Sequence, residues 1–143
     1  MTKAPGRPYL LGAGIVFIVN GGVSILTSLI GVITSGFWDR TLPMANGMSW
    51  SIFYSVSLLG ALLYLYAGIR GVKGNSQLEQ AEALRGIGII CMCYVVVSVI
   101  LNFFAYASLF HGFTNIISLM LGAALPILYI VGAGKNLEAY NES

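Results

Sequence analysis

The apolar positions of this chain fall into four long runs separated by shorter, more polar stretches. The runs cover residues 10–33, 50–69, 87–109 and 114–133, and none contains Asp, Glu, Lys, Arg or His. A helix needs about 20 predominantly apolar residues to cross a hydrocarbon core roughly 30 Å thick. No run shows the alternating polarity of a transmembrane strand. The pattern predicts an all-α integral membrane bundle of four transmembrane helices, arranged as two helical hairpins in one domain over residues 1–143.

The composition agrees with a chain whose main solvent is lipid. Hydrophobic residues make up 57% of the sequence and charged residues 8%, whereas charged residues are about 25% of an ordinary soluble domain. The mean hydropathy is +0.86. Residues 34–49, 70–86 and 110–113 connect the runs and leave no room for a separate soluble domain. We expect membrane lipids, and no nucleic acid, as partners.

Basic residues are distributed unequally over the two sides of this predicted bundle. The segments of one side carry six of them, Lys3, Arg7, Arg70, Lys73, Arg85 and Lys135, and the other side carries Arg40 alone. Positive residues favour the cytoplasmic side. We therefore expect a multi-pass protein of the bacterial inner (cytoplasmic) membrane, with both termini and the loop 70–86 in the cytoplasm. Four tyrosines near the inner ends of the runs are interpreted as an interface belt: Tyr9, Tyr64, Tyr66 and Tyr129.

The inner loop lies in the stretch AGIRGVKGNSQLEQAEALRGIG, residues 67–88, which holds five of the twelve charged residues of the chain. Ser76 and Glu79 match a capping box, in which each side chain accepts a hydrogen bond from the backbone N–H of the other residue. The third helix is therefore expected to begin near Gln77. The basic residues of the stretch are Arg70, Lys73 and Arg85. Because lipid-binding clusters usually need four to eight basic residues, these three are interpreted as an orientation signal.

The first run carries a seam of small residues, at spacings of 7, 3, 4 and 3: Gly14, Gly21, Ser24, Ser28 and Gly31. Lipid tails give helices no hydrophobic reason to associate, so small residues that let backbones approach are the packing signal. The seam predicts close contact with a neighbouring helix.

Polar side chains inside the runs form a second set. Asn20 lies beside the seam, Ser98 and Asn102 lie in the third run, and Asn115 and Ser118 lie in the fourth. Polar groups facing lipid are costly unless a partner satisfies them. We expect these faces to meet in the bundle interior, as interhelical contacts or as the lining of a polar cavity.

A faint repeat relates the second and fourth runs, because LGA at 59–61 followed by LYL at 63–65 matches LGA at 121–123 followed by LYI at 128–130. A genuine repeat would give the two hairpins the same orientation. The segments ILYIVGAGKN at 127–136 and GIRGVKGN at 68–75, with the short Trp-bearing outer loop, resemble small four-span membrane proteins of Gram-positive bacteria, a group without an established activity. The resemblance implies the architecture and transfers no functional residue.

The residues that usually carry chemistry are few. Cys91 and Cys93 are the only cysteines, and two positions along a helix place their side chains about 200° apart. That geometry fits neither a disulfide nor a shared metal, so both are interpreted as small buried hydrophobic residues. His111 and Asp39 offer an acid–base pair on the outer side, but no nucleophile or metal cluster accompanies them. The sequence predicts no catalytic, cofactor-binding or metal site.

Two functions remain open. The first is a non-catalytic protein that associates through its helices as a partner or accessory subunit, with another membrane protein or with itself. The second is a passive carrier or a lipid- or small-solute-binding protein that uses the polar faces of runs one, three and four. Proton-coupled transport is disfavoured, because ionisable groups within the membrane normally mark such coupling and the four runs have none.

Overall fold

The computed structural model describes residues 4–44, 47–106 and 109–143. The side chains of residues 104–115 and of Ser118 are not described. It contains four helices and one 3-10 turn: α1 (Arg7–Thr41), α2 (Trp50–Gly74), η1 (Leu78–Gln80), α3 (Ala81–Tyr106) and α4 (Leu109–Asn141). The described residues form no strand. Each of the four helices holds a segment long and apolar enough to cross a membrane. The predicted all-α class with four helices of spanning length is confirmed.

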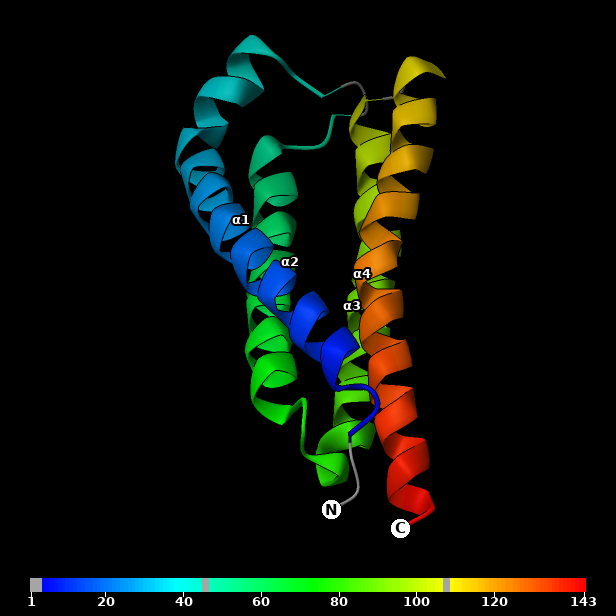
Figure 1. Ribbon diagram of the computed structural model, residues 1–143. Coiled ribbons are helices and arrows are strands. Elements are labelled where there is room, and N and C mark those ends of the chain that lie inside the picture. Colours follow the sequence, from blue (N-terminus) through cyan, green and yellow to red (C-terminus); the bar gives the residue numbers. More distant parts are fainter. Residues whose placement is uncertain (1–3, 45–46, 107–108) are drawn as a thin grey trace.

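The helices are arranged as two antiparallel pairs (Figure 1). α1 packs along α2, and α3 packs along α4. α1 is tilted, so that its start lies against α4 while its other end leans away from that pair. Both ends of the chain lie at the same end of the bundle, called here the terminal end. The opposite end, called the loop end, carries the connection between α1 and α2.

The helices are longer than the apolar runs that predicted them. α1 covers Arg7–Thr41 and α2 continues to Gly74, so much of the two expected loops, 34–49 and 70–86, is helical. Polarity marks where a chain leaves lipid, but the backbone hydrogen bonds of a helix continue beyond that point. At the start of α1, Pro8 fits the first turn, where its missing N–H costs nothing.

The start of α2 is held by a residue from the end of α1. The Asp39 carboxylate accepts hydrogen bonds from the backbone N–H of Trp50 and from the Ser49 hydroxyl, both at 2.8 Å. The Ser49 oxygen in turn accepts from the N–H of Ser51 at 3.1 Å. A carboxylate at a helix N-terminus satisfies free N–H groups and interacts favourably with the helix dipole. Asp39 therefore has a structural role in this hairpin.

The seam of small residues packs against α2. Gly14, Gly21, Ser28 and Gly31 are buried and Ser24 is half-buried. A methyl group placed on Gly21 would lie 2.7 Å from the backbone nitrogen of Leu65 and 2.9 Å from the carbonyl oxygen of Ala61. The two backbones therefore approach as closely as glycine permits.

Aromatic rings form the centre of the bundle. Phe17 stacks on Tyr64 with ring centroids 4.9 Å apart, and Tyr129 lies 5.7 Å from Phe17. The hydroxyl of Tyr129 donates to the carbonyl of Ala67 at 2.8 Å. Tyr129 is fully buried, so its interpretation as part of an interface belt is wrong. A buried tyrosine is stable here because its ring is packed and its hydroxyl has an acceptor.

At the terminal end, Asn136 joins three segments of the chain. Its side-chain oxygen accepts from the backbone N–H of Gly6 at 2.7 Å, and its side-chain nitrogen donates to the carbonyl of Asn75 at 3.1 Å. Asn136 is fully buried. The neighbouring Lys135 donates to the Tyr9 hydroxyl at 3.2 Å and lies over its ring. We call the Gly6, Asn75 and Asn136 contacts the asparagine knot.

The start of the third helical segment differs from the expected capping box. The cap position of η1 is Gln77, in an extended conformation, without a side-chain capping bond. Because α2 runs to Gly74, residues 75 and 76 form the turn that follows it, closed by the Gln77 N–H to the Gly74 carbonyl at 3.1 Å. Ser76 is exposed in this turn and Glu79 is exposed in η1. The chain reverses here by a turn, and Ser76 caps no helix.

Candidate ligand pocket

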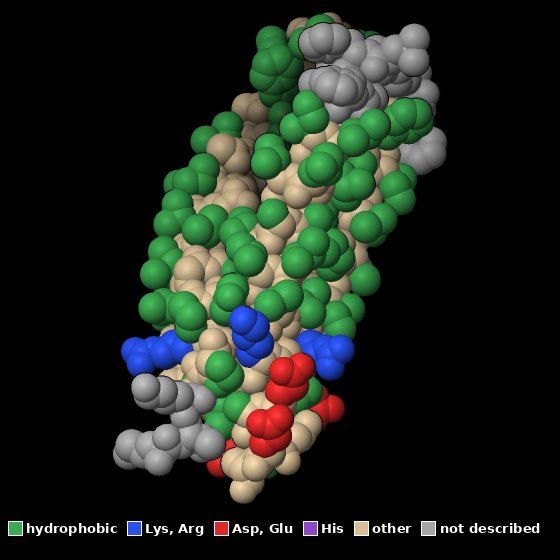
Figure 2. Space-filling view, turned by 45° about the vertical axis from the view of Figure 1, so that its right-hand side comes forward, with side chains coloured by type: hydrophobic (Ala, Val, Ile, Leu, Met, Phe, Trp, Pro, Cys, Tyr) green, Lys and Arg blue, Asp and Glu red, His purple; other side chains and the backbone are tan. Residues whose placement is uncertain are grey.

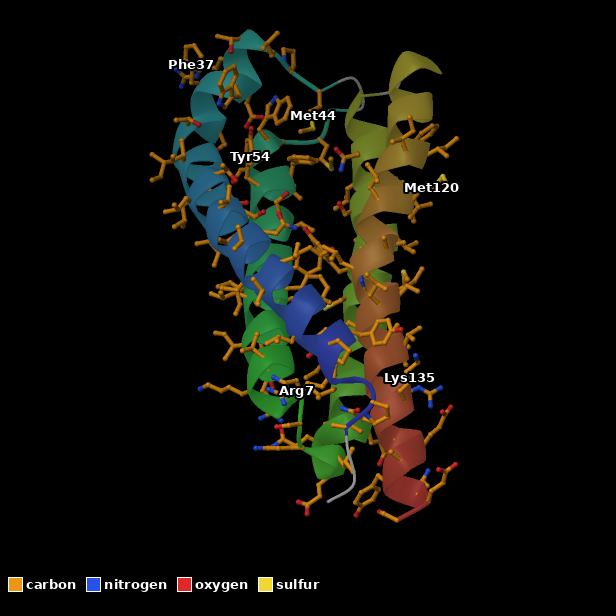
Figure 3. The ribbon with its side chains drawn as sticks, in the orientation of Figure 1. Arg7, Phe37, Met44, Tyr54, Met120 and Lys135 are labelled. Atoms are coloured by element: carbon orange, nitrogen blue, oxygen red, sulfur yellow. The ribbon has the colours of Figure 1, made fainter. Side chains whose placement is uncertain are left out.

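A partly enclosed pocket of about 240 Å³ lies between α1, α2 and α3. Seven of its eight lining residues carry a hydroxyl group. The residues are Ser24, Thr27 and Ser28 from α1, Tyr54, Ser57, Ala61 and Tyr64 from α2, and Tyr94 from α3. Tyr54, between α1 and α2, marks the side of the pocket nearer the loop end (Figure 3).

Tyr64 and Tyr94 limit the pocket on the side of the terminal end. Their rings meet edge to face, with centroids 5.4 Å apart. Tyr94 reaches α2 because Gly60 has no side chain: a methyl group there would lie 1.7 Å from the Cζ atom of Tyr94. Beyond these rings, Phe17 stacks on Tyr64 and continues into the aromatic centre. The pocket is therefore closed toward the terminal end by packed rings.

The hydroxyl groups of the lining fall into two classes. Thr27 donates to the carbonyl of Ser24 at 3.1 Å, and Ser57 donates to that of Phe53 at 2.9 Å, so both are satisfied within their own helices. The three tyrosine hydroxyls of the lining, among the described residues, make no hydrogen bond to protein. Each of these three hydroxyl oxygens keeps some exposed surface. With Ser28, the lining thus includes four hydroxyl groups that have no protein partner within the described residues.

All eight lining residues are uncharged. The lining has no carboxylate, imidazole, ammonium or guanidinium group, so tyrosine is the one common general acid or base type among its residues. It suits a ligand that exchanges hydrogen bonds with hydroxyl groups and carries no charge of its own. Over the described part of the chain, no three His, Cys, Asp or Glu residues lie close enough to hold a metal ion.

The predicted polar faces do not form this pocket. Asn20 is exposed, so the expectation that it faces the bundle interior is wrong. Its oxygen accepts from the Ser24 hydroxyl at 3.4 Å, which satisfies it within α1. Asn102 is half-buried and donates to the carbonyl of Ser98 on its own helix at 2.8 Å. The side chains of Asn115 and Ser118 lie outside the described residues.

Sequence reasoning missed most of the lining, although a signal was present. Tyr54, Ser57, Ala61 and Tyr64 recur at spacings of 3, 4 and 3, which places them on one face of α2. Ser24 and Ser28 were interpreted as packing residues, and they also line the pocket.

The two cysteines lie in different surroundings. Cys91 is buried and Cys93 is exposed, and both are free thiols. The interpretation as small buried hydrophobic residues is therefore right for Cys91 and wrong for Cys93. The side chain of His111 lies outside the described residues, and Asp39 holds the start of α2.

Comparisons with protein-family models, with curated proteins and with solved structures find no match for this chain.

Proposed function

We propose that this protein binds an uncharged amphiphile within the membrane, a molecule that carries a hydroxyl or carbonyl group on an apolar body, and acts as a passive carrier or lipid- or small-solute-binding protein. The supporting observation is the set of three accessible tyrosine hydroxyls without a protein partner. A polar group away from water is costly until it forms a hydrogen bond. A ligand that supplies this bond is favoured over an apolar lipid chain.

The size of the pocket limits what enters it. A volume of about 240 Å³ corresponds to about eight water molecules at liquid density. Pockets that enclose a whole drug-sized ligand measure roughly 300–1,000 Å³. The pocket therefore suits the polar group of an amphiphile, while the apolar remainder lies along the lipid-facing surface of the helices.

The lack of charge in the lining favours passive binding. An ionic head group would lie in a low-dielectric site without a counter-charge, which is strongly unfavourable. Coupling to protons or ions normally requires an ionisable residue within the membrane, and the lining has none. We therefore propose that the ligand enters and leaves by its own concentration gradient.

Association with another protein is the competing proposal. In the sequence, the small-residue seam favoured that proposal. In the structure, the seam packs against α2 of the same chain and is not available to a partner. We also propose, from the six-to-one distribution of basic residues, that the terminal end lies in the cytoplasm, with the helices spanning the cell membrane.

A pair of tyrosine variants tests the proposal. Tyr94→Phe removes one pocket hydroxyl and keeps the ring that packs on Gly60, whereas Tyr66→Phe makes the same change at an exposed position. The full chain is purified in mild detergent, and the small molecules that remain bound are identified and counted by mass spectrometry. Wild type and Tyr66→Phe should retain an uncharged amphiphile near one per chain. Tyr94→Phe should retain about tenfold less, as expected for loss of one hydrogen bond.

A second pair changes the volume of the pocket. Ser57→Leu fills it, and Ser55→Leu places the same side chain on the exposed surface of α2. Only Ser57→Leu should release the bound molecule. The proposal is wrong if the wild-type protein retains no such molecule, if both members of each pair behave alike, or if a stoichiometric protein partner is retained instead. The last result would favour the accessory-subunit hypothesis.

A further inference from the structure

Charged side chains at the terminal end lie in two layers. Figure 2 shows Lys and Arg side chains at one level across the visible face, where the hydrophobic surface ends, and acidic side chains beyond them. Five basic residues belong to this end: Arg7, Arg70, Lys73, Arg85 and Lys135. They come from the start of α1, the end of α2, the start of α3 and the last third of α4. We call them the basic belt.

The asparagine knot sets the level of two belt residues. Arg7 follows Gly6, whose N–H is bonded to Asn136, and Lys135 precedes Asn136. Arg7 and Lys135 are accordingly seen at similar heights in Figure 3. A single buried amide joins Gly6 to Asn136, 130 positions apart in the sequence, and thereby brings Arg7 and Lys135 to one level.

Contacts of α2 and α3 place the other three residues at the same depth. Arg70 and Lys73 lie between two carbonyls that accept from α4: that of Ala67 in α2, from Tyr129, and that of Asn75 just after α2, from Asn136. Arg85 follows Leu84, whose side chain would lie 3.2 Å from a methyl group on Gly74. Tyr129 and Asn136 are seven residues apart, about 10 Å along a helix. The belt therefore occupies a layer of roughly this thickness.

The acidic residues lie about one helical turn further from the apolar surface. Glu82 precedes Arg85 by three residues and Glu138 follows Lys135 by three, which is about 4.5 Å along each helix. Glu79 and Glu142 lie further out still. Among the described residues, no ion pair joins the two layers. Within the described residues, no Lys or Arg of the belt is therefore paired directly with an acidic side chain.

We propose that the basic belt binds the phosphate groups of anionic phospholipids in the leaflet at the terminal end. Lipid-recognition clusters usually hold four to eight basic residues. The loop 70–86 alone has three, but the fold adds Arg7 and Lys135, so the belt reaches that range. The basic belt lies next to the apolar surface, just as the phosphate group of a phospholipid lies next to its acyl chains. The acidic side chains then lie beyond the phosphates, in water, because repulsion between their negative charges and those of the phosphates keeps them out of the leaflet.

Arg70 supports this assignment by its own environment. Its Nε atom is buried and, within the described part of the chain, is the one buried side-chain nitrogen or oxygen without a hydrogen-bond partner. The side chain as a whole is half-buried, so part of it remains accessible. Arginine presents its donors in a planar fork that matches a phosphate. A phosphate at this level meets the accessible part of the Arg70 side chain and not the buried Nε atom.

Electron paramagnetic resonance of spin-labelled lipids tests the proposal. The full chain is reconstituted into phosphatidylcholine vesicles that contain a trace of spin-labelled phosphatidylglycerol or, in parallel, spin-labelled phosphatidylcholine. The relative association of each lipid with the protein is read from its motionally restricted fraction. Arg85→Gln removes one exposed belt residue, and Arg40→Gln removes the single exposed arginine of the loop end. A variant that combines Arg7→Gln, Lys73→Gln and Arg85→Gln removes the three exposed belt residues.

Wild type should prefer phosphatidylglycerol severalfold at low salt, by up to about fivefold for each basic residue that meets a phosphate. Arg85→Gln should lower the preference, the triple variant should bring it close to one, and Arg40→Gln should leave it unchanged. Circular dichroism confirms that each variant is folded, and Arg85→Gln provides the test if the triple variant is not.

Three results would overturn the proposal. The first is equal association of the two lipids with wild type, and the second is an equal decrease in Arg85→Gln and Arg40→Gln. The third concerns free phosphate: if inorganic phosphate removes the preference at an ionic strength where sodium chloride does not, the belt binds a soluble anion rather than lipid. A decrease that depends only on ionic strength agrees with lipid binding, because salt screens exposed charges.

Discussion

Replacement of Asn136 by leucine is the sharpest test of the asparagine knot. The side chains are similar in size, so the change removes hydrogen bonds with little change in volume. Two backbone groups lose their partners, the N–H of Gly6 and the carbonyl of Asn75. Both of these residues are buried, as is Asn136 itself. The variant therefore leaves one donor and one acceptor unsatisfied inside the protein.

The expected loss of stability follows from these two groups. A buried donor or acceptor left without its partner costs about 1–3 kcal/mol, which gives about 2–6 kcal/mol for the pair. The knot lies at the terminal end of the bundle, and the low end of that range applies if water replaces one of the lost partners. We expect Asn136→Leu to reduce the free energy of unfolding by about 2–4 kcal/mol.

Asn141→Leu is the matched control, because it makes the same substitution at the exposed last residue of α4. Unfolding of the two variants and of wild type is followed by circular dichroism during titration of mild detergent micelles with dodecyl sulfate. Asn141→Leu should lie within about 0.5 kcal/mol of wild type, as is usual for surface changes. Equal stabilities of Asn136→Leu and Asn141→Leu would refute the reasoning, since a buried amide that joins three segments cannot then stabilise the fold.

Three further outcomes are expected. Gly21→Leu should lower the thermal stability in detergent more than Leu26→Ala does, because its side chain meets the backbone of α2 while Leu26 is exposed; equal losses would contradict the close packing. Ser76→Ala should change the free energy of unfolding by less than about 0.5 kcal/mol and leave amide hydrogen exchange at residues 77–83 unaltered. Reporter fusions after Asn46 and Phe113 should both report a non-cytoplasmic position, and cytoplasmic signals would reverse the orientation.

The helices were predictable from the sequence, but several of their ends were not. Four apolar runs are a strong signal because each one satisfies the length that a bilayer imposes. A helix end depends on which group caps it, and that group can belong to another segment. The start of α2 is capped by Asp39, eleven residues before Trp50. Ser76 matched a local capping pattern, but the continuation of α2 to Gly74 placed it in a turn.

The pocket was harder to predict for a different physical reason. In a soluble helix an apolar stripe indicates the buried face, but helices surrounded by lipid are apolar on all sides. Tyr129 is buried and Tyr66 is exposed, although both lie in similar runs. The small residues of α1 gave the correct packing face because close backbone approach requires them. The spacing of Tyr54, Ser57 and Tyr64 marks one face of α2, but only the positions of α1 and α3 make that face a pocket.

The asparagine knot has a consequence for the order in which this protein is made. Asn136 is synthesised 130 residues after Gly6, whose N–H it binds. At about 5–20 residues per second, the ribosome needs on the order of ten seconds to cover that distance. α1 and α2 are neighbours in the chain, and both are made well before then, so the seam of small residues can pack against α2 first. Until Asn136 has been made, the N–H of Gly6 lacks this partner, so the pair of helices that is synthesised first is the last to be completed.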